Sequence, residues 1–318
     1  CWGKPWELAE TSNWNFVYNN IDIYKFYIGN INLTALPRLN RDTVKQFVSA
    51  LINKDIKIAV ELGGLLDWHA AKGSMVGEAS FQQEWAKLQE FINLIKEIDP
   101  SRNIDILDFD GPIRRMLFPN NVKSDYHTVE SAVDELFEVV KWWKDSIPTI
   151  EINLLTNFPN WAWDNTPAYF KISGEESGYG HYEDVLEAVK RKSAETGLTI
   201  DALTIDNPYD YATGKAQTNQ PDLIKDVNWM QRIQELADSA KDMGIKVNMI
   251  FNTNGGRTAQ GYAEQTLELI DLYHQEVGIP DGYWIQSWYQ LPDKWLPENE
   301  NFTMTNITLE AIKRIIGE

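Results

Sequence analysis

The stretch Ile104-Asp105-Ile106-Leu107-Asp108-Phe109-Asp110-Gly111-Pro112 places three acidic residues in a segment that otherwise has the composition of a buried strand. Successive side chains of a strand point to opposite faces of its sheet. If the large side chains of Leu107 and Phe109 face covering helices, then Asp108 and Asp110 face the opposite, inner side. Because a buried carboxylate is costly unless it is paired or used, the stretch predicts an inner face that carries polar chemistry near its carboxyl end.

Similar short runs of Ile, Val and Leu alternate with segments of helical period along the whole chain, which is typical of βα units around a parallel sheet. We expect strands near 23–29, 56–62, 104–109, 150–156, 201–206, 245–251 and 282–287. We expect helices near 42–54, 79–98, 128–145, 182–196, 223–243, 258–277 and 308–316.

Seven such units predict an α/β fold, a single (β/α)8 barrel domain over residues 1–318. An eighth strand is either short, near 11–18 or 300–306, or absent, in which case the barrel has seven strands. A doubly wound open sheet is the weaker alternative, since no G-x-G-x-x-G turn follows an expected strand.

Charge and hydropathy restrict the partners. The formal net charge of −18 argues against nucleic acid and anionic membrane surfaces, which would be repelled, and favours a neutral or cationic ligand. No apolar run is long enough to predict a transmembrane segment.

Cys1 is the one cysteine of the chain. A chain that starts at Cys is typical of a mature bacterial lipoprotein, which would place the protein outside the cell or at its surface with a lipid anchor at Cys1. A removed signal or a shortened chain explains the same beginning equally well.

The other expected strands also turn polar side chains inward when the large aliphatic residues are assigned to the helix side. These side chains are Lys25 and Tyr27 on the first strand, Glu61 on the second, Asn157 on the fourth, Asp206 on the fifth, Asn252 after the sixth, and Gln286 with Trp288 on the last. Active sites of (β/α) barrels lie at the carboxyl ends of the strands, so we expect these residues to meet at one mouth.

The loops that follow the strands add aromatic residues. Trp161 and Trp163 follow the fourth strand, Tyr209 follows the fifth, and Trp288 follows the last. Aromatic faces beside amides and carboxylates suit a sugar, whose C–H faces stack on rings while its hydroxyls form directional hydrogen bonds. We therefore expect a carbohydrate substrate.

The spacing Asp105-x-x-Asp108-x-Asp110 resembles the D-x-x-D-x-D-x-E strand motif of the family 18 glycoside hydrolases, the chitinase group. The resemblance covers about eight residues and implies a (β/α) barrel in which the final Glu of the motif is the acid. Pro112 occupies the position of that Glu, so the chitinase mechanism is not implied. The clan A glycosidases carry an Asn-Glu pair after the fourth strand and a Glu on the seventh; Thr156-Asn157 and Gln286-Ser287 stand there and exclude that mechanism.

We therefore expect a glycoside hydrolase in which Glu61, Asp110 and Asp206 supply the catalytic carboxylates, since hydrolysis needs two of them. We expect one of Glu61 and Asp110 to be the acid and the other the nucleophile or base, with Asp206 as a third member. We expect Asp108, Lys25, Tyr27, Asn157, Trp161, Trp163, Tyr209, Asn252, Gln286 and Trp288 to bind the substrate. We expect no cofactor and no metal.

Three alternatives stay open. Asp108 and Asp110 could pair with Lys25, Arg114 or Arg115 in a structural network. The chain could bind carbohydrate without catalysis, as chitinase-like lectins do. It could also be a polysaccharide lyase or a sugar enzyme that holds Ca²⁺ or Mg²⁺ on its carboxylates.

Overall fold

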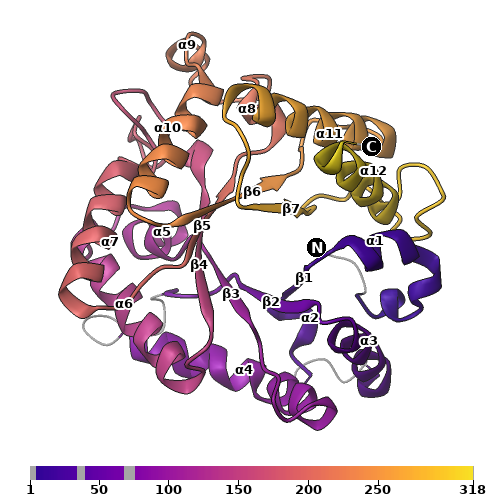
Figure 1. Ribbon diagram of the computed structural model, residues 1–318. Helices are drawn as coiled ribbons and strands as arrows, with labels where there is room; N and C mark the ends of the chain where they lie inside the picture. The colour runs from indigo at the N-terminus through magenta and orange to yellow at the C-terminus, as the bar shows by residue number, and fades with distance from the viewer. Residues whose placement is uncertain (1–4, 34–39, 68–75, 318) are drawn as a thin grey trace.

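The computed structural model describes residues 5–33, 40–67 and 76–317, so Cys1 lies outside the described residues. Seven parallel strands form one sheet in chain order, and all seven expected strands are confirmed. The strands are β1 (Ile23–Tyr27), β2 (Lys57–Leu62), β3 (Ile106–Asp110), β4 (Glu151–Asn157), β5 (Ala202–Asp206), β6 (Lys246–Phe251) and β7 (Gly282–Ile285). Figure 1 shows the sheet curled around a central space with helices on its outside, as in a TIM barrel.

The long helices follow the strands in the expected βα alternation. They are α3 (Arg41–Asn53), α4 (Val76–Ile98), α6 (Val129–Ser146), α7 (Tyr182–Thr196), α10 (Trp229–Asp242), α11 (Ala259–Glu276) and α12 (Met304–Ile316). Short helices fill the loops: η1 (Pro5–Ala9), η2 (Thr11–Trp14), α1 (Asn15–Asn20), α2 (Ile28–Ile31), α5 (Pro112–Leu117), η4 (Pro119–Asn121), η5 (Phe158–Asn160), α8 (Tyr209–Ala212) and α9 (Pro221–Ile224). None of the described helices is long and apolar enough to cross a bilayer.

The helix expected over 223–243 is two helices. The segment begins with the four-residue helix α9, and α10 starts only at Trp229. Asn228 ends the break between them, because its side chain accepts a hydrogen bond from the backbone N–H of Gln231 at 3.1 Å and caps α10.

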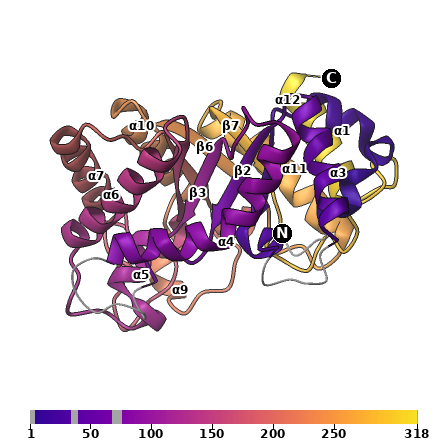
Figure 2. The ribbon, with the colours of Figure 1, turned by 90° about the horizontal axis from the view of Figure 1, so that it is seen from below.

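An eighth strand near 11–18 or 300–306 is not formed. The first segment folds into η2 and α1, and the second leads into α12. The carboxylate of Glu298 accepts hydrogen bonds from the backbone N–H groups of Phe16 (2.9 Å) and Val17 (3.1 Å), so it satisfies two of the free donors at the start of α1. Figures 1 and 2 show α1 and α12 side by side. Among the described residues β1 and β7 do not pair, and the barrel is not closed by hydrogen bonds.

The two faces of the sheet bury different residues, as the alternation predicts. Leu107 and Phe109 are fully buried in the large core between sheet and helices. Ala59, Ile106, Leu155, Ile250 and Trp284 form a separate apolar cluster inside the barrel. The ammonium group of Lys25 on β1 lies 4.5 Å from the centre of the Trp284 ring on β7, so side chains span the seam that backbone hydrogen bonds leave open.

Three aspartates make the same side-chain-to-backbone hydrogen bond just before their strands begin. The Oδ2 atoms of Asp105, Asp201 and Asp281 accept hydrogen bonds from the backbone N–H groups of Ile58, Ile152 and Val247, each at 2.7 Å. Each contact joins the start of one strand to the preceding strand. Asp105, the first acid of the D-x-x-D-x-D spacing, therefore accepts a backbone hydrogen bond at the end of the sheet that lies opposite to the mouth.

Candidate active site

Two cavities lie among the loops at the carboxyl ends of the strands. The smaller, the carboxylate pocket, has a volume of about 430 Å³, and its lining includes Asp110, Arg114, Asn157, Trp161, Tyr179 and Asp206. The larger, the aromatic cavity, has a volume of about 830 Å³, and its lining includes Glu7, Asn254, Ser287, Asp293 and Trp295. Trp288 and Tyr289 line both cavities, which therefore lie against one another.

Asp206 ends β5 and is almost completely buried at the floor of the carboxylate pocket. Burial disfavours its charged form and raises the pKa of Asp206 to about 7, although hydrogen bonds from Asn252 and Asn157 oppose the change. Both amide Nδ2 atoms lie 3.4 Å from its oxygens. This carboxyl therefore keeps its proton to a much higher pH than an ordinary aspartate does.

Asp110 ends β3 and faces the same pocket from the other side of β4. The guanidinium of Arg115 donates a hydrogen bond to its Oδ2 at 2.9 Å and contacts its backbone carbonyl at 3.3 Å. Burial raises the pKa of Asp110, and the charges of Arg115 and Arg114 oppose this change. Asp110 is thus a partly exposed carboxyl held in one orientation by its own ion pair.

Glu61 and Asp108 belong to a buried cluster under this site. The Nζ atom of Lys25 lies 2.6 Å from Asp108 Oδ2 and 3.3 Å from Glu61 Oε2, and Gln286 donates to the same Glu61 oxygen at 2.9 Å. The side chains of Lys25, Glu61 and Asp108 are only 6%, 2% and 0% exposed. None of the four residues of this lysine cluster lines either cavity.

The lysine cluster is electrically unbalanced, because one cation faces two carboxylates. Burial raises the pKa of Glu61 to about 7, and the charge of Lys25 opposes this change while the charges of Asp110 and Asp108 add to it. Asp108 precedes Asp110 by two residues on β3, so the lysine cluster lies directly below the carboxyl end of the strand that carries Asp110. The network anticipated as an alternative from the sequence is therefore present, as Lys25–Asp108 and Arg115–Asp110.

The four loop aromatic residues expected to bind substrate divide into two pairs. Trp161 and Trp288 line the carboxylate pocket. Trp163 points elsewhere: its indole Nε1 donates to Glu235 at 3.0 Å and its ring packs on Phe158. Tyr209 is buried too, and its hydroxyl accepts a hydrogen bond from a lysine of the neighbouring loop. Neither residue lines either cavity. Period and composition do not reveal the direction in which a loop side chain points, so the sequence did not separate these two residues from Trp161 and Trp288.

Tyr27 is 36% exposed and lines neither cavity. Its ring lies against the backbone of Gly29 and Gly63, where an added Cβ would approach ring atoms to 2.8 and 2.9 Å. Those two glycines therefore leave room for the ring beside the mouth. Tyr27 is level with Glu61 in the β1–β2 register, which places both side chains on the same face of the sheet. Burial raises the pKa of Tyr27, and the charges of Glu61 and Asp110 add to this change.

The sequence did not single out Tyr179 and Asn121, which also line the carboxylate pocket. Tyr179 lies between Gly178 and Gly180, both with positive φ, and its ring packs edge-on against Trp161 with centroids 5.6 Å apart. The Gly-Tyr-Gly sequence was a usable signal, since glycines at positive φ hold a loop in a shape that other residues rarely adopt. The guanidinium of Arg114 lies over the Tyr179 ring at 6.0 Å.

Metal-ligand geometry is not found in the part of the chain that the structure describes. Within residues 5–33, 40–67 and 76–317, no group of three His, Cys, Asp or Glu side chains is arranged to hold a metal ion.

Comparison with known proteins identifies the fold. No family model and no curated protein matches the sequence. Among solved structures, GH5_18 from Streptomyces cattleya in complex with GlcNAc aligns with 98% of this chain and 76% of its own, at 12% identity and a TM-score of 0.53. The active domain 2 of a thermostable chitinase from Pyrococcus furiosus aligns with 99% of this chain and 92% of its own, at 11% identity and a TM-score of 0.48. A D-psicose 3-epimerase aligns with 100% of this chain and 97% of its own, at 9% identity and a TM-score of 0.48. The first of these likenesses supports a TIM-barrel-like fold and leaves the reaction open.

Proposed function

We propose that the protein is a glycoside hydrolase in which Asp206 is the general acid and Asp110 the general base. The observation that carries the proposal is that these two carboxyls line one pocket of about 430 Å³ at the carboxyl ends of the strands. The pKa of Asp206 is raised to about 7, and a general acid works best when its pKa lies near the working pH. Trp161 and Trp288 supply aromatic faces for a sugar ring in the same pocket.

Strand spacing favours the inverting form of the reaction. Asp110 and Asp206 end β3 and β5, and β4 runs between them. Asp110 is level with Leu155 of β4 and Asp206 is level with Asn157, so the two acids are offset by two residues along the strand direction. Two strand spacings of about 9.6 Å and this offset of about 6.6 Å separate their backbones by roughly 12 Å, and side chains that point inward toward the barrel axis shorten the separation. Their carboxyl groups therefore approach the separation of about 6.5–9.5 Å that leaves room for a water molecule beside the anomeric carbon.

The proposed reaction needs no other reactant than water. Protonated Asp206 donates its proton to the glycosidic oxygen as the bond from that oxygen to the anomeric carbon breaks. Ionised Asp110 removes a proton from water, whose oxygen forms the new bond to the anomeric carbon on the opposite face. The cation of Arg115, 2.9 Å from Asp110, favours the ionised form that this role requires.

This proposal changes the role expected for Glu61. Glu61 is 1% exposed and is held by Lys25 and Gln286 beneath the pocket. We therefore assign the lysine cluster to joining β1, β2 and the end of β7 to β3, the strand that carries Asp110. In this proposal Asn252 and Asn157 also have a positioning role, because their amide groups donate hydrogen bonds to Asp206.

A polysaccharide and aryl-glycoside panel, read by release of reducing ends, tests the proposal. We expect turnover by the unmodified protein and a loss of at least about a hundredfold in both Asp206→Asn and Asp110→Asn, the size of a general acid or base contribution. Binding of the same glycan, measured by calorimetry, should be retained by both variants. Asp242→Asn, at an exposed position at the end of α10, is the matched control and should behave as the unmodified protein does.

Carbohydrate binding without catalysis is the second candidate, and the Arg115–Asp110 ion pair favours it. A carboxylate that is committed to a guanidinium is a weaker base than a free one. Glycan binding with no turnover on any substrate of the panel would establish this candidate and contradict hydrolysis. Turnover that a chelator abolishes would instead support metal-dependent sugar chemistry.

A further inference from the structure

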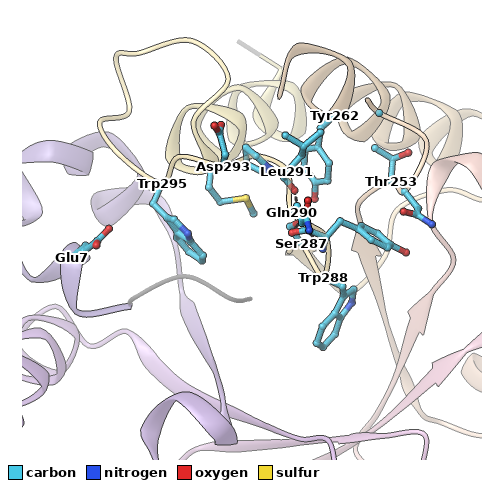
Figure 3. Close-up of a pocket in the computed structure, with 14 residues that line it drawn as sticks. Glu7, Thr253, Tyr262, Ser287, Trp288, Gln290, Leu291, Asp293 and Trp295 are labelled. Atoms are coloured by element: carbon cyan, nitrogen blue, oxygen red, sulfur yellow. Dashed lines mark hydrogen bonds between the residues drawn. The ribbon is translucent and has the colours of Figure 1, made fainter. Parts of the chain in front are cut away.

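The aromatic cavity is larger than the pocket that holds the proposed catalytic pair, and the proposed reaction leaves it without a role. Its volume of about 830 Å³ is within the range of a complete ligand site. Figure 3 shows Trp288 on one side of this cavity and Trp295 with Glu7 on the other. They come from segments far apart in sequence, the loop after β7 and the N-terminal helix η1.

Trp288 and Tyr289 connect this cavity to the catalytic pair, since both residues also line the carboxylate pocket. Figure 3 shows the Trp288 indole projecting from its loop, away from the other labelled side chains. A ligand that extends from Asp206 past Trp288 therefore enters the aromatic cavity, where Trp295 offers a second indole. Two indoles separated along one continuous lining suit successive rings of a linear chain, each of which presents an apolar C–H face.

We propose that the aromatic cavity binds further sugar units of a neutral polysaccharide, so that the enzyme cleaves chains within their length and acts poorly on disaccharides. The inference rests on the proposed function and specifies its substrate class. The polar groups that line the cavity fit this ligand, because the side-chain amides of Asn254 and Gln290 can exchange hydrogen bonds with hydroxyl groups.

Charge selects a neutral chain over an acidic one. The charged residues that line the aromatic cavity are Glu7 and Asp293, and no Lys, Arg or His is among its described lining residues. The net charge of −18 adds to this negative field. A chain of uronic acids would meet repulsion along this whole extension, whereas a neutral glycan is bound through stacking and hydrogen bonds.

The experiment uses cello-, xylo-, manno- and chito-oligosaccharides from disaccharide to hexasaccharide, with binding and turnover measured in parallel. We expect kcat/KM and affinity to rise with chain length in the unmodified protein. Trp295→Ala should lower kcat/KM for the hexasaccharide about tenfold, the loss of one stacking contact of about 1.4 kcal/mol, and should have a smaller effect on the disaccharide. Tyr126→Ala, which removes an aromatic residue that is 75% exposed and lines neither cavity, is the control and should affect neither substrate.

The possible failures are separable. Turnover or binding that does not depend on chain length, or a Trp295→Ala effect equal on both substrates, overturns the inference and leaves the hydrolase proposal standing. Length-dependent binding that Trp295→Ala abolishes, without turnover of any chain, supports the extended site and overturns hydrolysis. A preference for polyuronates over every neutral chain contradicts the charge argument, and failure to bind or cleave any glycan overturns both proposals.

Discussion

Replacing Lys25 by Met removes the single cation of the lysine cluster while keeping most of the apolar stem of the side chain. In the folded protein Lys25 Nζ contacts Asp108 at 2.6 Å and Glu61 at 3.3 Å, and both carboxylates are at most 2% exposed. Breaking a buried ion pair on one side costs about 3–5 kcal/mol, because the remaining charge has no compensation. We therefore expect Lys25→Met to lower the free energy of unfolding by about 4 kcal/mol at pH 8, a large part of the stability of a typical domain.

The loss should depend on pH in a direction that the structure fixes. The Lys25 charge opposes the upward shift of the pKa of Glu61, so in Lys25→Met this pKa rises further above 7. Protonation then removes one of the two uncompensated charges, and the destabilisation should shrink as the pH falls from 8 to 6. Urea unfolding followed by circular dichroism at both pH values measures this change.

An exposed ion pair of the neighbouring strand provides the matched control. Lys57 on β2 contacts Glu151 at 2.7 Å, but these side chains are 47% and 35% exposed, so Lys57→Met should cost less than about 1 kcal/mol. Combining Lys25→Met with Glu61→Gln and Asp108→Asn should restore most of the lost stability, since no buried charge is then left. Equal losses in the two single Lys→Met variants would refute the reasoning.

Three further predictions concern the carboxyls. Activity should fall as the pH rises through about 7, where Asp206 loses its proton. Asn252→Ala should move this basic limb of the pH profile to higher pH by up to about one unit, because it removes a donor that stabilises the ionised form of Asp206. A pH profile of kcat/KM that does not move in this variant argues against Asp206 as the acid. The folded-state pKa of Glu61, about 7, exceeds its ordinary value of 4.5. The contribution of Glu61 to stability is therefore complete below pH 4.5 and is lost as the pH rises through 7. Urea unfolding at a series of pH values should show that Glu61→Gln removes up to about 3 kcal/mol of the pH dependence of the free energy of unfolding. Asp201→Ala leaves the backbone N–H of Ile152 without its acceptor and should cost about 1–3 kcal/mol in urea unfolding, whereas no measurable loss would show that the repeated aspartates are dispensable.

Much of the fold was predictable because a parallel barrel imposes two periods on the sequence, the alternation of side chains along each strand and the helical period between strands. Ile106, Asp108 and Asp110 share a parity that separates them from Leu107 and Phe109, and the structure follows that division. That neither 11–18 nor 300–306 forms a strand was not predictable in the same way. The first of these segments is helical where Glu298 accepts hydrogen bonds at the start of α1, a contact between residues about 280 positions apart in sequence.

The candidate site was only partly predictable, because parity gives the face of a side chain but neither its depth nor its partner. Asp105, Asp108 and Asp110 lie in one strand segment and have three different environments: a backbone N–H of the preceding strand, the Lys25 ammonium, and an open pocket. Asp108 and Lys25 are 83 residues apart in sequence. The loop residues were harder still, since the direction of Trp163 or Tyr179 follows from loop contacts that have no period.

A crystal structure of Asp206→Asn with a bound neutral oligosaccharide would test the central claim most directly, since this variant should bind the chain without cleaving it. We predict the glycosidic oxygen of one linkage within about 2.6–3.2 Å of the side chain at position 206. Asp110 should lie on the opposite face of the adjoining sugar ring, and the chain should continue past Trp288 toward Trp295. A chain bound elsewhere on the surface, or one that reaches neither carboxyl, would contradict the account.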